Sequence, residues 1–263
     1  NQYSSTLNIE HGTLSNYSYT ADGNLLSDGR RTYTWDAKNR LTGVSGNGNG
    51  NGNFTVGYEY DHNDLRVSRT EGAKMTKYYY DGSLLLAETD GNGRVDKIYI
   101  NDGEGIVGMV RYIYKDSGEF SHYSRHYYMY DSLGSVAAVI GENGMPMMEY
   151  SYTPYGATMN VERDDVNNLR FVGRYSGYKD DVTGLTYFWH RWYDSEDGRW
   201  VSRDELLQQT RLNMKGQYLF VCNDIIGDMT LQTNDGLYIY SLNSPINYID
   251  IEGLRPTHPP GIT

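Results

Sequence analysis

The chain has 263 residues, including 30 Gly, 27 Tyr and a single Cys, and its formal net charge is −11. An acidic surface repels phosphate backbones, so composition argues against nucleic-acid binding, and the lone Cys222 excludes an intramolecular disulfide framework. No apolar run approaches the roughly 18 residues that a membrane helix needs, so we expect no membrane span.

Tyrosine and glycine together predict many short strands. Tyrosine favours half-buried pleated surfaces, and glycine supplies the positive φ that tight hairpin turns require. Hydrophobic residues make up only 38% of the chain, which indicates a thin, layered core. We therefore predict an all-β fold of mostly antiparallel strands, with helix confined to short pieces such as residues 205–212.

A repeat runs through the first 155 residues and is already in progress near the N-terminus, which favours a segment of a longer chain. In most copies two aromatic residues stand two positions apart, and Asp follows, often with Gly. The copy at Tyr99 is looser and has Asn101 in the second aromatic position. The copies begin at Tyr17, Tyr33, Tyr58, Tyr78, Tyr99 and Tyr128, and their aspartates are Asp22, Asp36, Asp61, Asp81, Asp102 and Asp131. Such aromatic pairs point to one strand face, so successive hairpins are expected to stack their rings, while the Asp accepts backbone hydrogen bonds in the turn.

This tyrosine-aspartate repeat resembles the YD repeats of Rhs proteins and of the C components of insecticidal toxin complexes. Further segments follow the order and spacing of the Rhs repeat-associated core domain. They are residues 131–136, 150–156, 169–175, 181–194, 198–204 and 237–254. The resemblance implies antiparallel hairpins forming a segment of a hollow shell (residues 1–155), closed by an Rhs core domain (156–254), with the start of a tail or truncated toxin in 255–263.

The core domain of this family is similar to an aspartic autoprotease. Carried over by position, the resemblance implies a catalytic pair, Asp204 and Asp250, with Arg203 beside the first, and a cleaved bond between Leu254 and Arg255. One carboxylate holds a water as base while the other, protonated, polarises the carbonyl. Because two carboxylates about 3 Å apart cannot both ionise, one pKa rises. Arg203 keeps one partner ionised or stabilises the oxyanion.

A structural alternative stays open. Asp-x-x-Gly is also a common type I turn, so Asp204 and Asp250 can serve as turn residues of a plug that does not cut. The family's proline after each Asp is replaced by Glu205 and Ile251, and the connection over residues 205–236 looks longer than usual. Either change can spoil the geometry of a dyad.

The resemblance implies a function in encapsulating a C-terminal toxin and releasing it, in competition between bacteria or against hosts. Any enzymatic activity is then a single-turnover cut in cis. The implied partners are the toxin domain and further shell repeats or a partner shell chain, and the implied location is secreted or cell-surface. No cofactor or metal is expected, because His122 and His126 lack a third ligand and the G-x-G-x-x-G at residues 103–108 precedes no helix. The rival hypothesis is a surface module whose aromatic face recognises glycans or a protein.

Overall fold

The structure is a computed structural model, and it describes residues 5–8, 13–48, 52–161, 164–203, 211–212, 218–219, 238–251 and 256–258. Within these residues the strands form one 13-stranded sheet, one 4-stranded sheet and two 2-stranded sheets, all antiparallel. The only helical segments among them are short 3-10 turns, η1 (Gly173–Tyr175) and η3 (Ser241–Asn243). The all-β prediction is therefore confirmed.

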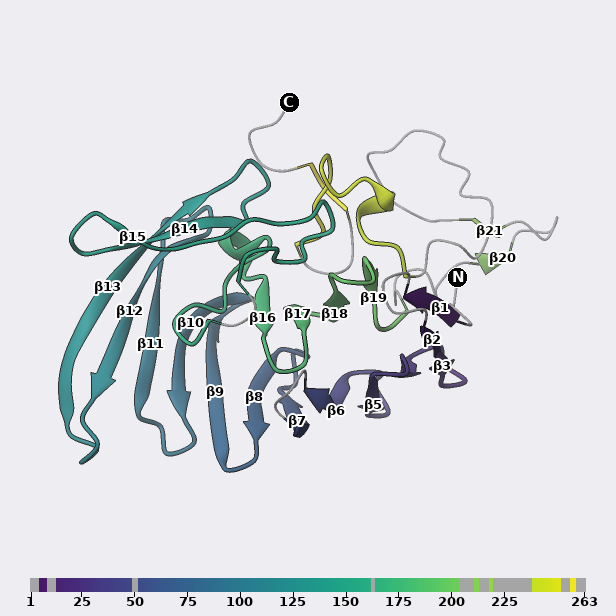
Figure 1. The fold of residues 1–263 in the computed structure, drawn as a ribbon, viewed down its shortest axis with the longest axis horizontal. Helices are drawn as coiled ribbons and strands as arrows, with labels where there is room; N and C mark the ends of the chain where they lie inside the picture. The colour runs from purple at the N-terminus through teal and green to yellow at the C-terminus, as the bar shows by residue number, and fades with distance from the viewer. Residues whose placement is uncertain are drawn as a thin grey trace.

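The 13-stranded sheet is a meander, which we call the wall, and each strand pairs with the next one along the chain. Its strands are β3 (Ser18–Tyr19), β4 (Leu25–Ser27), β5 (Arg31–Trp35), β6 (Leu41–Gly48), β7 (Gly52–Tyr60), β8 (Arg66–Glu71), β9 (Lys74–Asp81), β10 (Leu84–Asp90), β11 (Val95–Asn101), β12 (Ile106–Tyr114), β13 (Phe120–Tyr130), β14 (Val136–Gly141) and β15 (Pro146–Glu149). Figure 1 shows the wall curving around the smaller 4-stranded sheet.

Four of the six repeat aspartates accept backbone hydrogen bonds in their hairpin turns as predicted, whereas the turn at Asp22 is capped by Thr20. In the β7–β8 turn the carboxylate of Asp61 accepts hydrogen bonds from the backbone N–H groups of Asn63 and Leu65, both at 2.9 Å. Asp36, Asp102 and Asp131 accept backbone N–H groups in the same way. Asp81 differs because it ends β9 and pairs with Leu84 across a two-residue turn, in which Gly82 has φ +59°. A turn this short leaves no loop for the carboxylate to cap.

The second aromatic residue of a repeat ties its strand to the preceding repeat. Tyr60 donates a hydrogen bond to the backbone carbonyl of Leu41 over 2.7 Å, and Tyr80 donates to that of Arg66 over 2.9 Å. Three more rings bond an earlier carbonyl in this way: Trp35 to Leu25, Tyr130 to Ile106 and Tyr152 to Val136. These contacts, which we call latches, stabilise the stacking of hairpins that the sequence predicts.

The first tyrosine of each repeat points into the core. Five of them are at most 8% exposed: Tyr33, Tyr58, Tyr78, Tyr99 and Tyr128. They pack against residues 164–203, which we call the inner layer. It contains the 4-stranded sheet of β16 (Tyr178–Asp180), β17 (Leu185–Phe188), β18 (Arg191–Asp194) and β19 (Arg199–Trp200). One hydrophobic cluster joins the wall to the inner layer, so the division between residues 155 and 156 stays a prediction.

Two short hairpins complete the described strands, β1 (Ser5–Asn8) with β2 (Thr13–Asn16) and β20 (Arg211–Leu212) with β21 (Tyr218–Leu219). The helix predicted over residues 205–212 is wrong at its last two residues, because Arg211 and Leu212 pair with β21 and place Leu212 opposite Tyr218. Residues 205–210 lie outside the described part of the chain. Among the described residues, no helix is long and apolar enough to span a membrane.

Candidate cleavage site

Asp250 lies in a buried corner formed by two segments that are distant in sequence. It follows η3, and its side chain is only 2% exposed. The NH2 group of Arg191, on β18 of the inner layer, lies 3.1 Å from Oδ2 of Asp250. A guanidinium at this distance stabilises a carboxylate relative to the neutral acid. Asp250 is therefore held by a buried ion pair rather than only by a turn.

Arg191 is fixed by its own packing. Its guanidinium carbon lies 4.1 Å from the ring centre of Trp200, and its side chain is 4% exposed. Stacking on an aromatic face positions the planar guanidinium while its N–H groups remain free to bond a carboxylate. The sequence analysis did not single out Arg191. No local sequence pattern marks it, because the burial of all four β18 residues, which gives this cation its need for a partner, appears only in the folded structure.

An aromatic cluster supports this corner. It consists of Phe171, Val172, Phe188, Tyr193, Trp200, Tyr240 and Ile249, all buried. The rings of Tyr193 and Tyr240 are 4.5 Å apart, and burial holds the pKa of both hydroxyls well above the ordinary value. These phenols therefore stay neutral at physiological pH and supply packing rather than charge.

The chain on either side of the predicted cleaved bond is joined by backbone hydrogen bonds. The N–H of Ile249 donates to the carbonyl of Thr257 over 2.8 Å, and the N–H of Thr257 donates back over 2.7 Å. Leu254 and Arg255 lie outside the described residues, and so does Asp204. The predicted pairing of Asp204 with Asp250 therefore stays a prediction.

Arg203 is described, and it faces a different part of the molecule from Asp250. Its side chain lies against the turn before β4, so close that a Cβ added to Gly23 would be 2.0 Å from Cδ of Arg203. Its NH1 group is 3.5 Å from the backbone carbonyl of Asp22. The described geometry thus gives Arg191, and not Arg203, the place beside Asp250. The predicted role of Arg203 near Asp204 stays untested.

The hydroxyls on the inner face of the wall bond to buried polar groups. Tyr58 donates to Asp180 and Tyr128 to Asn167, at 2.7 and 3.1 Å, and Tyr150 donates to Asp164. All three acceptors belong to the inner layer. Because the repeat tyrosines are buried against this layer, their stacked face is not open to a glycan. The aromatic repeat is a structural feature of this chain.

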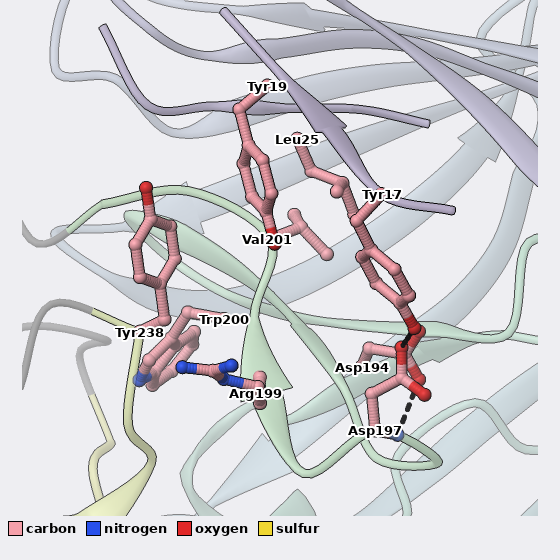
Figure 2. Close-up of a pocket in the computed structure, with 9 residues that line it drawn as sticks. All are labelled: Tyr17, Tyr19, Leu25, Asp194, Asp197, Arg199, Trp200, Val201 and Tyr238. Carbon is pink, nitrogen blue, oxygen red and sulfur yellow. Dashed lines mark hydrogen bonds between the residues drawn. The ribbon is translucent and has the colours of Figure 1, made fainter. Parts of the chain in front are cut away.

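A small cavity lies between the first wall strands and the inner layer (Figure 2), and residues of both line it. Its volume of about 20 Å³ is close to that of one water molecule. Beside it the hydroxyl of Tyr17 donates to Oδ2 of Asp197 over 2.5 Å. Burial and the neighbouring Asp194 raise the pKa of Asp197. A larger, open hollow of about 530 Å³ is lined by Thr153, Tyr155, Ala157, Ser195, Glu196, Asp197, Gly198, Arg199, Ile239 and Asn243.

A meander of hairpins that are tied by latches, have an Asp in several of their turns and wrap around an inner layer is the arrangement of YD-repeat shell proteins. The model of the Teneurin YD-shell family matches residues 2–246, and the chain belongs to this family. The resemblance of the repeat to YD-repeat shell proteins is thereby confirmed.

Proteins with a similar sequence include a bacterial toxin subunit. The chain is 35% identical over 195 residues to tRNA nuclease WapA of Bacillus subtilis (strain 168), which covers 71% of the chain but only 8% of that protein. It is 26% identical over 245 residues to toxin subunit YenC1 of Yersinia entomophaga, covering 86% of the chain and 22% of the subunit. The crystal structure of TcdB2-TccC3 shares the fold, with a TM-score of 0.58 at 19% identity over 92% of this chain and 12% of that one.

Proposed function

We propose that this chain is a wall segment and core of a shell that encloses a C-terminal toxin, and that it cuts itself after Leu254 with Asp204 and Asp250. The observation that carries the proposal is the buried Arg191–Asp250 ion pair, only four residues before the bond. The Ile249–Thr257 bridge adds support, because it ties together the chain on both sides of that bond. Such proximity makes the cut intramolecular, with its entropic advantage.

The proposed roles follow from charge. Asp250, beside a guanidinium, is the ionised member and takes a proton from the attacking water. Asp204, protonated, donates to the carbonyl oxygen of Leu254 as the water oxygen bonds to its carbon. The C–N bond to Arg255 then breaks, and the new amine takes up the proton that Asp250 received. Leu254 ends as a carboxylic acid, and both aspartates regain their starting states.

The proposal also covers partners and location. The outermost wall strands, β3 and β15, each pair with only one neighbour among the described residues. Exposed edges of this kind invite further strands, and we assign them to more shell repeats or to a partner shell chain. The names of WapA and YenC1 support a toxin as the cargo and a bacterial protein that acts outside its cell.

The test is mass spectrometry of a chain extended beyond Thr263 by a small reporter domain. The parent is expected to release the reporter at Leu254–Arg255, and Asp250→Asn or Asp204→Asn to slow release by orders of magnitude. Glu205→Gln, which alters only the residue in the family's proline position, is expected to cleave like the parent. Release that persists in both Asn variants would refute the dyad.

A stability control is needed because Asp250→Asn breaks the buried ion pair with Arg191, and breaking such a pair costs about 3–5 kcal/mol. The double variant Arg191→Gln with Asp250→Asn removes both charges and is expected to recover most of that stability while remaining uncleaved. If the double variant cleaves, Asp250 is structural. An intact parent with a normal melting temperature would establish the non-cleaving plug, with Glu205 and Ile251 in place of proline as the cause.

A further inference from the structure

A lysine, an asparagine and a glutamate meet where the wall touches the inner layer. Lys97 is on β11, Glu88 on β10, and Asn168 precedes β16 in the inner layer. Nζ of Lys97 lies 3.0 Å from Oδ1 of Asn168 and 3.3 Å from Oε2 of Glu88. We propose that Lys97 and Asn168 join spontaneously in an isopeptide bond, with Glu88 as the proton-transfer group.

Two of the three groups, Lys97 and Glu88, are buried, and Asn168 is partly exposed. The side chains of Lys97 and Glu88 are 4% and 2% exposed. The contact between Nζ of Lys97 and Oε2 of Glu88 places the carboxylate where it can accept the lysine proton during the reaction. A neutral amine is the form that can attack a carbonyl carbon.

Neighbouring contacts orient the two reacting side chains. The amide nitrogen Nδ2 of Asn168 donates to the backbone carbonyl of Lys179 over 3.1 Å, so Oδ1 faces Lys97 and the leaving nitrogen lies on the other side. The hydroxyl of Tyr99 donates to Oε1 of Glu88, which keeps Oε2 for Lys97. Reactants held in this way need little further ordering to react.

The reaction balances without an oxidant or cofactor. Glu88 takes a proton from the Lys97 ammonium, and the lone pair of Nζ then forms a bond to Cγ of Asn168 while Glu88 protonates Oδ1. Glu88 next moves a proton from Nζ to Nδ2, and the Cγ–Nδ2 bond breaks to release ammonia. The carbonyl reforms by returning the Oδ1 proton to Glu88, and the ammonia leaves as ammonium with that proton. The products are one amide bond, one ammonium ion and an ionised Glu88.

The experiment is intact mass followed by tandem mass spectrometry of a protease digest. The purified protein is expected to be lighter than its sequence by one ammonia and to yield a single branched peptide containing Lys97 and Asn168. Lys97→Arg retains the charge beside Glu88 but removes the nucleophile, so it is expected to have full mass and separate peptides. Asn168→Ala and Glu88→Gln are expected to behave likewise, with a native strand spectrum by circular dichroism.

Two controls separate the bond from other sources of ammonia loss. Succinimide formation at an exposed Asn-Gly step, such as Asn143-Gly144, also releases ammonia, but it leaves the peptides separate and persists in Lys97→Arg. Lys38→Arg alters an exposed lysine paired with Asp64 and is expected to keep the branched peptide. A parent of full mass, or one that loses ammonia without a branched peptide, overturns the proposal. Cross-linking that survives in Glu88→Gln overturns the role of Glu88.

Discussion

The hydroxyl of Tyr58 donates a hydrogen bond to Oδ2 of Asp180 over 2.7 Å, and the two residues are 122 positions apart. Arg69, on the next wall strand, holds both oxygens of the same carboxylate, with Nε 2.8 Å from Oδ2 and NH2 3.0 Å from Oδ1. One aspartate of the inner layer is thus bound by two neighbouring strands of the wall. This contact fixes β16 against β7 and β8.

We expect Asp180→Ala to destabilise the protein by about 3–5 kcal/mol, because the mostly buried Arg69 loses its buried carboxylate and retains only the more exposed Glu71. Tyr58→Phe removes one hydrogen bond to a group that retains Arg69, and we expect a loss of about 1–2 kcal/mol. Urea unfolding of both variants measures these values. Equal losses of unfolding free energy in the two variants would show that Arg69 on β8 adds nothing to the hydrogen bond between Tyr58 and Asp180.

Acid is expected to weaken the same contact. Burial alone would raise the pKa of Asp180, but hydrogen bonds from Arg69 and its positive charge hold that pKa below the ordinary value. An aspartate whose pKa is lowered on folding contributes stability above its unfolded value of about 3.9, and this is lost as pH falls through the folded value. Unfolding free energy should therefore fall below about pH 5, and less steeply in Asp180→Asn. Asp197, whose pKa is raised, contributes with the opposite sign.

Tyr79 and Tyr80 provide a matched test of the latches. They are neighbours on β9, but Tyr80 bonds the carbonyl of Arg66 from the buried face, whereas Tyr79 is 46% exposed. We expect Tyr80→Phe to cost about 1–2 kcal/mol, since a buried carbonyl loses its donor, and Tyr79→Phe to change stability by less than about 0.5 kcal/mol. The melting temperatures of the two variants test this prediction. Similar decreases in both would rule out the Tyr80 latch as a stabilising contact.

The repeat period let the sequence predict the wall, because the alternation of aromatics and the Asp turn are local features. The burial of Arg66 could not be predicted in the same way. Its fully buried guanidinium lies 4.0 Å from the ring centre of Tyr78 and 4.6 Å from that of Tyr178. Tyr178 comes from the inner layer, about a hundred residues later, and only the folded topology joins them. Arg191 was missed for the same reason, since its partner Asp250 is 59 positions away.

The latches also determine how the shell can change in length. Each ties one hairpin only to the hairpin before it, so a whole repeat inserted into a wall of this kind would meet the same contacts on both sides. The inner layer differs, because residues such as Asp180 and Asn167 form hydrogen bonds with particular wall strands. These contacts run from Tyr17 to Tyr150, so within that span the number of repeats is fixed by the segment they enclose, and repeats are interchangeable units only outside it.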